Sequence, residues 1–347
     1  MRRLAVSLLL VTGLLSGCVG FAPDDPVDSA AQEVGASDAS AALASDRFIA
    51  ADGTALPLRA WLPDSQPSAV ILALHGLNDY SNAFALPAPG LTGQGIAVYA
   101  YDQRGFGAAP RRGHWAGDGA MESDATLAAT LLRQRYPDTP LYLLGESMGG
   151  AVAVLAATGA TPAPVDGVIL AAPAVWGRQT MNVFERVGLW VIRQLPPLEF
   201  TQRSVPYKIH PSDNIPMLRA LGDDPLVLKQ ARTDTLAGVV DLMSTALARA
   251  PRLAVPALVL YGEKDEIVPR DAVASFVDSL PANARRRQRV ALYPNGYHML
   301  LRDLQGATVL ADVAAWARDP RAELPSGADS GGRAVLTGHG ESFALLR

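Results

Sequence analysis

The sequence predicts an α/β fold built on a doubly wound, mostly parallel sheet. Mostly apolar runs of four to six residues recur along the chain, as expected of strands covered on both faces. Segments with apolar residues at helical spacing lie between several of them. Strands that alternate with helices favour a parallel sheet with helices on both faces. The expected strands are residues 69–74, 96–101, 141–144, 167–171, 257–261 and 289–293, and the expected helices of the core are residues 121–136, 271–280 and 301–317.

The chain is organised around residues 141–158. An apolar run leads through Gly145-Glu-Ser-Met-Gly149 into a segment rich in Ala, Val and Leu. A G-x-S-x-G sequence between a strand and a helix is the context of a nucleophile elbow, a turn so tight that Gly145 and Gly149 must lack a Cβ. Ser147 is therefore the predicted nucleophile; a plain Gly-rich turn is the alternative interpretation.

The first eighteen residues resemble a bacterial lipoprotein signal. A basic head precedes the apolar residues 4–15, which are too few to span a bilayer. Leu15-Ser-Gly-Cys18 then matches all four lipobox positions, so Cys18 is the predicted lipid anchor. An ordinary secretory signal is the alternative. Since Val19 stands where an Asp would favour the inner membrane, the resemblance implies a bacterial cell envelope protein anchored in the outer membrane.

The composition of the chain excludes several classes of function. The chain has 347 residues, a formal net charge of −4 and one cysteine, Cys18. No cluster of basic and aromatic residues suggests nucleic-acid binding, and a single cysteine excludes a disulfide framework or a Cys-based metal site. The expected division is a signal peptide (1–17), a disordered linker (18–45), the first part of the core (46–174), a helical lid (175–250), the second part of the core (251–318) and a loose C-terminal tail (319–347).

The predicted lid breaks the alternation of strands and helices. About eighty residues without a buried-strand pattern separate two expected strands, whereas such connections usually have about 2–6 residues. The insertion contains a helical pattern at residues 226–247 and would lie above the carboxyl edge of the sheet, where ligands bind in open α/β folds. Trp176, Phe184 and Trp190 are the predicted wall for an acyl chain; mutual packing of the lid helices is the alternative.

Five motifs together carry a resemblance to a known family. The sequence is similar, from residue 47 to about 318, to the monoacylglycerol lipase/lysophospholipase-like branch of the α/β-hydrolases. One departure is Ala108-Ala-Pro110, which replaces the Ser-x-Gly that often follows the turn at Gly105-Phe-Gly107. The motifs are His75-Gly-Leu-Asn, Asp102-Gln-Arg-Gly-Phe-Gly, Gly145-Glu-Ser-Met-Gly-Gly, Gly262-Glu-Lys-Asp-Glu-Ile-Val-Pro and Asn295-Gly-Tyr-His298.

A serine nucleophile needs a base and a group that orients the base. Of the five histidines, His298 is the predicted base because it follows the last strand at the edge where the elbow lies. The acid is expected between Ser147 and His298 in the chain order of α/β-hydrolases. Asp265 is the first choice, in a Gly-x-x-Asp-x-x-Val-Pro sequence similar to the acid loop of this superfamily. Its rivals are Glu263, Glu266, Asp102 and Asp124.

The oxyanion formed by attack on an ester needs two N–H donors. The amide of Met148, directly after the nucleophile, is the first, and the amide of Leu77 is the predicted second. His75 is expected to anchor the Leu77 loop without transferring protons.

The resemblance implies hydrolysis of carboxylic esters of lipid-like substrates, of monoacylglycerol or lysophospholipid type, through an acyl-enzyme and with no cofactor or metal. A thioesterase, an amidase or peptidase, and an acyltransferase would use the same triad, so these alternatives stay open. A non-catalytic lipid-binding surface lipoprotein is a further alternative. The sequence does not indicate an oligomeric state.

Overall fold

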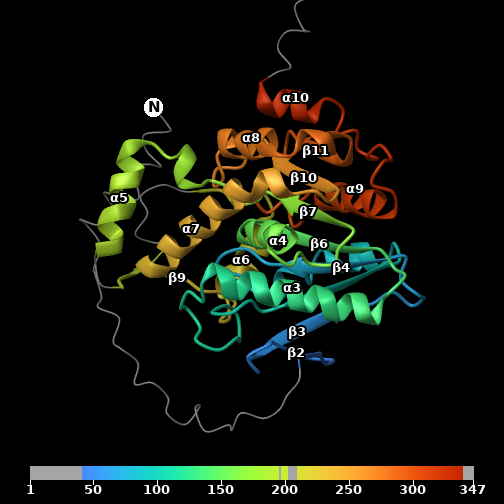
Figure 1. Ribbon diagram of the computed structural model, residues 1–347, viewed down its shortest axis with the longest axis horizontal. Helices are drawn as coiled ribbons and strands as arrows, with labels where there is room; N and C mark the ends of the chain where they lie inside the picture. The colour runs from blue at the N-terminus through green and yellow to red at the C-terminus, as the bar shows by residue number, and fades with distance from the viewer. Residues whose placement is uncertain (1–40, 195–196, 202–208, 339–347) are drawn as a thin grey trace, which may run out of the picture.

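The structure is a computed structural model that describes residues 41–194, 197–201 and 209–338. The predicted signal peptide and Cys18 lie outside the described residues. Nine of the described strands form one sheet (Figure 1). Their order across the sheet is β1 (Ala42–Leu43), β2 (Arg47–Ile49), β3 (Ala55–Trp61), β5 (Ile96–Tyr101), β4 (Ala69–Leu74), β6 (Leu141–Glu146), β7 (Gly167–Ala171), β10 (Ala257–Gly262) and β11 (Gln288–Tyr293).

The sheet is parallel from β5 to β11 and antiparallel from β1 through β3 to β5. Each residue of β4 is buried, and its side chains alternate between the two layers of the core. Val70, Leu72 and Leu74 join one layer, while the residues between them join the other. This double coverage explains why the strand reads as a continuous apolar run in the sequence. The predicted α/β fold is confirmed.

Helices cover both faces of the sheet (Figure 1). One layer contains α3 (Asp118–Arg135), α4 (Met148–Thr158) and α8 (Arg270–Ser279). The other contains α2 (Ala88–Thr92) and α9 (Gly306–Arg318). The chain therefore winds in both directions from the middle of the sheet, as in other doubly wound folds.

The direction of winding reverses between β4 and β6. The chain passes from β4 outward to β5, and then returns across β4 to β6 and continues to β7. In open α/β sheets, ligands bind at the carboxyl ends of the strands beside such a reversal. His75-Gly76-Leu77 follows β4 and Ser147 follows β6, so the two predicted parts of the site lie at this point.

The insertion between β7 and β10 has its own small architecture. It contains α5 (Val183–Gln194), β8 (Glu199–Thr201), α6 (Ile215–Asp223), β9 (Gln230–Arg232) and α7 (Thr233–Arg249). Strands β8 and β9 pair antiparallel in a separate two-stranded sheet. Helix α7 packs on α4, and α5 packs on α7 at the left edge of the molecule in Figure 1. The helix expected at residues 226–247 begins seven residues later, because residues 230–232 pair with β8 instead.

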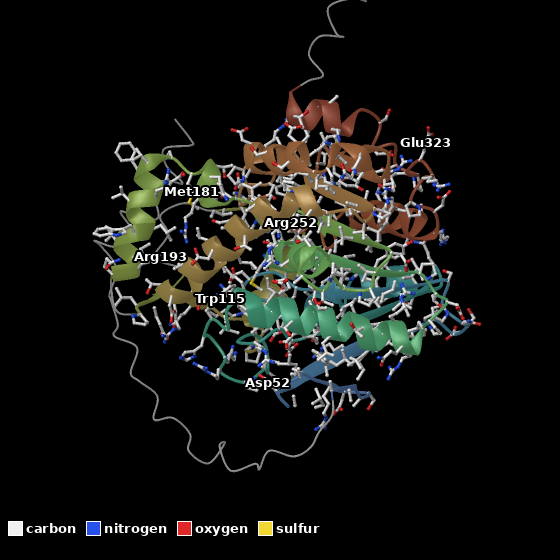
Figure 2. All side chains as sticks on the ribbon, in the orientation of Figure 1. Asp52, Trp115, Met181, Arg193, Arg252 and Glu323 are labelled. Carbon is white, nitrogen blue, oxygen red and sulfur yellow. The ribbon has the colours of Figure 1, made fainter. Side chains whose placement is uncertain are left out.

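Two expected boundaries are wrong. The folded part begins within the expected linker, because Ala42 and Leu43 pair with β2. The expected loose tail is folded as far as residue 338. Leu324 and Leu336 are buried there, and α10 (Gly332–Thr337) packs on α8 and β11. Glu323 of this segment is labelled at the right of Figure 2. Two apolar anchors separated by Gly- and Ser-rich turns give no periodic signal, which explains the error.

Asp312, fully buried on α9, also holds this segment. Its carboxylate accepts hydrogen bonds from the Ser326 amide (3.0 Å) and the Tyr293 hydroxyl (2.7 Å). Among the described residues, no helix is long and apolar enough to cross a membrane.

Candidate active site

Ser147 stands at the turn between β6 and α4 in a conformation that non-glycine residues rarely adopt. Its φ is 53° and its ψ is −115°. Hydrogen bonds on both sides hold this backbone: the Ser147 amide donates to the Ala171 carbonyl (3.0 Å), and the Ser147 carbonyl accepts from the Ala174 amide (2.9 Å). Strained backbone held by its surroundings is typical of active sites. This is the local geometry of a nucleophile elbow.

The glycines beside Ser147 are needed because the backbone is packed against itself. A Cβ at Gly145 would collide with the carbonyl of Gly149, and a Cβ at Gly149 would collide with the carbonyl of Leu74. In both cases the obstacle is backbone, which cannot move aside as a flexible side chain can. The sequence interpretation of these two glycines is confirmed by the packing.

Replacement of Gly149 by alanine is expected to lower the free energy of unfolding by about 2–4 kcal/mol, because β4 and α4 must separate to admit the methyl group. The matched control is Gly119→Ala on α3, where a Cβ meets open space. That substitution is expected to raise stability by up to about 1 kcal/mol through helix propensity. Urea unfolding measures both changes; equal midpoints for the two variants would contradict the packing argument.

The predicted oxyanion loop lies against the nucleophile. A Cβ built on Gly76 would be 3.4 Å from the Cβ of Ser147, so the loop after β4 contacts the elbow at van der Waals distance. Within the described residues, the amides of Leu77 and Met148 donate no hydrogen bond to protein atoms. Met148 is also the first residue of α4, whose N-terminal amides carry partial positive charge. Both amides are thus available, and their oxyanion role stays a prediction.

His75 holds this loop in place. Its Nδ1 donates to the Gly76 carbonyl (2.8 Å) and its Nε2 accepts from the Gln103 amide (3.0 Å). Complete burial is the main cause that lowers the pKa of His75, so the ring is neutral near pH 7. Both ring nitrogens are engaged with backbone, in agreement with the predicted anchoring role.

His298 and Asp265 form the central polar pair of the site. The His298 Nδ1 lies 2.8 Å from the Asp265 Oδ2, and both side chains are buried. The other carboxylate oxygen of Asp265 accepts the amides of Ile267 (2.7 Å) and Val268 (3.0 Å). Two backbone donors therefore fix the carboxylate, and the carboxylate fixes the imidazole with Nε2 left for a proton transfer.

The rival carboxylates make other contacts. Glu263 and Glu266 are exposed. Asp102 accepts the amides of Ser81 (3.0 Å) and Ala108 (2.9 Å). Asp124 is ion-paired with Arg104 (2.6 Å). Asp265 is the one of these five carboxylates that contacts His298 in the described structure.

The pKa of His298 sets a pH dependence. Burial acts to lower this pKa, but the carboxylates of Asp265 and Glu146 outweigh burial and raise the pKa above 6.5. A general base must be neutral, so kcat/KM for an ester substrate is expected to fall below a midpoint that lies above pH 6.5. The free energy of unfolding depends on pH in the opposite sense. The raised pKa of His298 stabilises the fold below pH 6.5, and this contribution is lost as the pH rises through the pKa of His298 in the folded protein. A pH–rate profile with its acid midpoint at or below 6.5 would contradict this.

A buried network of three charges, which the sequence did not indicate, includes the residue next to Ser147. Arg302 donates from Nη1 to Asp79 (2.8 Å) and from Nη2 to Glu146 (3.1 Å). All three side chains are at most 7% exposed. The position of Glu146 inside the G-x-S-x-G motif is the one local indication that it belongs to the site. Nothing in the sequence indicates its partners, because Asp79 and Arg302 are 67 and 156 residues away in the chain.

The predicted acyl wall is not formed as expected. Phe184 and Trp190 on α5 are 71% and 63% exposed, so neither ring is enclosed. Trp176 is partly buried and packs against the core, and its contact with substrate stays a prediction. Phe184 and Trp190 are exposed because α5 buries its opposite face, including Leu189 and Ile192, against α7.

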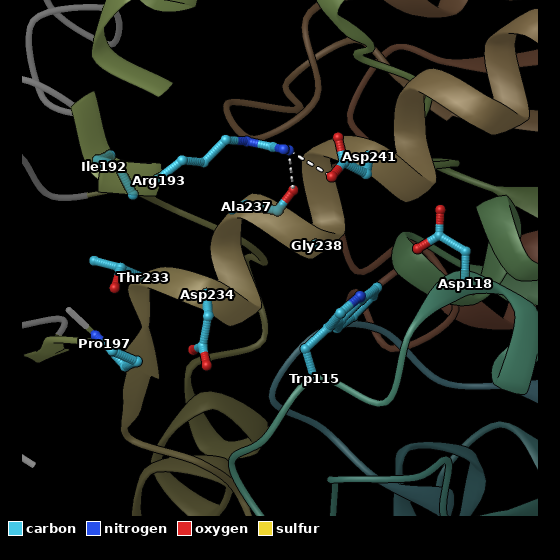
Figure 3. Close-up of a pocket in the computed structure, with 10 residues that line it drawn as sticks. All are labelled: Trp115, Asp118, Ile192, Arg193, Pro197, Thr233, Asp234, Ala237, Gly238 and Asp241. Atoms are coloured by element: carbon cyan, nitrogen blue, oxygen red, sulfur yellow. Dashed lines mark hydrogen bonds and ion pairs between the residues drawn. The ribbon is translucent and has the colours of Figure 1, made fainter. Parts of the chain in front are cut away.

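A cavity of about 390 Å³ lies between α5, α7 and the segment before α3 (Figure 3). Trp115 and Asp118 line one side, and Arg193 crosses the other side to reach Asp241. Its described lining includes no residue of the predicted triad or the oxyanion loop. This cavity is therefore separate from the polar centre at the strand ends.

The doubly wound sheet, the strained serine between β6 and α4, and the buried His–Asp pair at the strand ends together define an α/β-hydrolase. A model of the Hydrolase_4 family, described as serine aminopeptidase, S33, matches residues 65–305, which is more than half of the chain. The chain belongs to this family.

Individual relatives are similar over most of the chain. Monoacylglycerol lipase of Mycolicibacterium smegmatis is 25% identical over 281 residues, covering 78% of this chain and 95% of that protein. Monoglyceride lipase of Mus musculus is 27% identical over 275 residues, covering 78% and 88%.

Solved structures share the fold. Monoacylglycerol lipase of Paleococcus ferrophilus superposes with a TM-score of 0.62 at 23% identity, over 76% of this chain and 99% of that one. A soluble variant of Saccharomyces cerevisiae monoglyceride lipase, in complex with a substrate analog, gives a TM-score of 0.65 at 18% identity, over 77% and 92%.

Proposed function

We propose that this chain is a serine hydrolase that cleaves carboxylic esters of lipid-like substrates, of monoacylglycerol or lysophospholipid type. One observation carries the proposal: a fixed Asp265–His298 pair, 2.8 Å apart, lies close enough to Glu146, the residue before the strained Ser147, for that carboxylate to raise the pKa of His298. The similarity to monoacylglycerol and monoglyceride lipases supports the choice of substrate.

The proposed reaction has two half-reactions. His298 takes the proton of the Ser147 hydroxyl as its oxygen attacks the ester carbonyl, and the resulting oxyanion accepts hydrogen bonds from the Leu77 and Met148 amides. The bond to the alcohol breaks, and His298 returns the proton to the leaving oxygen. Water then attacks the acyl-enzyme with the same base, which releases the fatty acid and restores Ser147.

A substrate panel tests the class. The full chain is assayed with a monoacylglycerol, a lysophospholipid, an acyl thioester and an aminoacyl p-nitroanilide, with Ser147→Ala as the blank. The proposal expects the highest kcat/KM for one of the two lipid esters. Because the family description names an aminopeptidase, the anilide is the informative competitor. A higher kcat/KM for the anilide or the thioester would overturn the proposed substrate class.

Contact with a lipid surface is a second part of the proposal. The exposed apolar residues of α5 lie on one side of the helix, at the spacing i, i+1, i+4, i+7 and i+8. A helix with such a face, carrying Phe and Trp, is suited to lie in a membrane interface. The residues are Val183, Phe184, Val187, Trp190 and Val191.

Double replacement of Phe184 and Trp190 by serine is expected to weaken binding to phosphatidylcholine/phosphatidylglycerol vesicles by about tenfold or more, because two large aromatic contacts are lost. Flotation with vesicles measures this in full chains that also carry Cys18→Ser and so lack the proposed lipid anchor. The matched control replaces Leu62 and Leu86, which are also more than half exposed but lie outside α5. If the control weakens binding as much as the α5 variant, the assignment of the face fails.

We also propose that Cys18 carries a lipid anchor in the bacterial cell envelope, at the outer membrane. The lipobox sequence supports this. Replacement of Cys18 by serine is expected to move the full chain from the membrane fraction to the soluble fraction. Intact mass spectrometry is expected to find an acylated N-terminal cysteine in the unaltered protein, and a mature chain without acyl groups would refute the anchor.

A further inference from the structure

The buried network of Arg302, Asp79 and Glu146, here called the Arg302 network, connects the loops after β11 and β4 with the end of β6. Arg302 lies four residues after His298, Glu146 directly precedes Ser147, and Asp79 lies two residues after Leu77. Arg302 and Asp79 lie in the loops after β11 and β4, and Glu146 is the last residue of β6. One guanidinium therefore contacts the loops of the predicted base, nucleophile and oxyanion donor.

The chemistry of the network suits precise spacing. The guanidinium is planar, and its two terminal nitrogens donate to different carboxylates, which fixes direction as well as distance. All three groups lie out of water, so each must keep its partner: an unpaired charge in this place would be strongly unfavourable. The loops can separate only by breaking charged hydrogen bonds in a dry interior.

We propose that Arg302 is a positioning residue that, through Asp79 and Glu146, sets the spacing of the base, the nucleophile and the oxyanion amides. The proposal rests on the proposed function, since it assigns the supporting structure of that same site. A buried ion pair does not by itself make a fold more stable than apolar packing would. The expected effect of altering Arg302 is therefore on turnover more than on folding.

The network also has an electrostatic effect on the base that can be separated from its geometric effect. The charged groups facing His298 are Asp265 from the loop after β10, Glu146 from the end of β6, and Arg302 from its own loop. Glu146 acts to raise the pKa of His298 and Arg302 acts to lower it. Asp79 contacts the other terminal nitrogen of Arg302 from the loop after β4.

The first experiment compares Arg302→Lys with Arg104→Lys in the full chain, using a p-nitrophenyl ester. Arg104 is a matched control because it also joins two carboxylates, Asp52 and Asp124, but these lie on the β2–β3 hairpin and on α3. Asp52 is labelled at the lower edge of the molecule in Figure 2. A lysine keeps the charge but cannot reach two partners with a rigid fork.

Arg302→Lys is expected to lower kcat by about 10²-fold with KM changed less than threefold, as expected when reacting groups are displaced by about 1 Å. Arg104→Lys is expected to keep kcat within twofold. Equal kcat values for the Arg302→Lys and unaltered proteins would overturn the proposal. So would losses in both lysine variants that simply follow their thermal midpoints. If the unaltered chain hydrolyses no ester, the proposed function fails instead.

The second experiment compares the pH profiles of kcat/KM for Glu146→Gln and Asp79→Asn. Each variant removes one carboxylate from Arg302. Glu146→Gln is expected to move the acid midpoint to lower pH, because a negative charge that favours protonated His298 is gone. Asp79→Asn is expected to lower kcat and to move the midpoint less, because it leaves the charge of Glu146 in place. An unmoved midpoint in Glu146→Gln, or equal shifts in both variants, would refute the assigned geometry.

Discussion

Replacement of Ser147 by alanine is expected to lower kcat/KM for ester substrates by about 10⁴–10⁶-fold. The expected size follows from the loss of covalent catalysis, with the oxyanion amides left in place to give a small residual rate. Alanine keeps the Cβ that packs near Gly76 and removes only the hydroxyl. Steady-state hydrolysis of a short p-nitrophenyl ester, followed with enough enzyme to detect one part in 10⁶, measures the loss.

The control for this variant is its stability. Because the strained φ of 53° applies equally to serine and alanine, the thermal midpoint is expected to stay close to that of the unaltered chain. A folded Ser147→Ala protein with more than one hundredth of the original turnover would show that another nucleophile acts.

Replacement of Asp265 by asparagine is expected to lower kcat by about 10³–10⁴-fold. The amide group fits the space of the carboxylate, but its NH₂ cannot accept the Nδ1–H of His298, so the wrong imidazole tautomer is favoured. The loss of negative charge also removes stabilisation of the protonated imidazole that forms during the reaction. Hydrolysis of the same ester at pH 8 measures kcat.

The matched control is Glu263→Gln, two residues earlier in the same loop. Glu263 is exposed and its nearest cation, Arg270, is 3.9 Å away, so kcat is expected to stay within twofold. Equal losses in Asp265→Asn and Glu263→Gln would contradict the assignment of Asp265 as the orienting acid.

The fold could be predicted because its signals are local. Strands covered on both faces, such as β4, β5 and β10, show as continuous apolar runs, and the structure gives the boundaries Ala69–Leu74 and Ile96–Tyr101 that the runs predict. The glycines of the elbow show in the sequence because backbone contacts forbid any side chain there. The α/β-hydrolase fold and the family are confirmed by the architecture and by the family match.

The remaining features depend on contacts between distant parts of the chain. Helix α10 is held by contacts with α8 and β11, and Leu336 is the only buried large apolar side chain of that short helix, so no periodicity marks it. Exposure of Phe184 and Trp190 depends on which face of α5 packs on α7. Because both faces of α5 carry apolar residues, the sequence does not show which face is buried.

The residues of the site likewise fall into those marked by a local motif and those that depend on distant contacts. Ser147, Asp265 and His298 each follow a strand in a short motif, so sequence alone suggests them, and the structure brings Asp265 and His298 into contact. Arg302 pairs with Asp79, which is 223 residues away in the chain, and an arginine after an apolar pair carries no local mark of burial. Catalytic roles for all of these residues stay predictions until activity is measured.

Ser147 is the predicted nucleophile, made reactive by His298 and Asp265. The most direct measurement treats the full chain with a fluorophosphonate at pH 8 and locates the adduct by peptide mass spectrometry. One adduct is expected, on the peptide that contains Ser147, and labelling is expected to be at least 10²-fold slower in His298→Ala, where the base is lost. An unlabelled Ser147 in the unaltered protein, or an adduct on a different serine, would contradict this assignment.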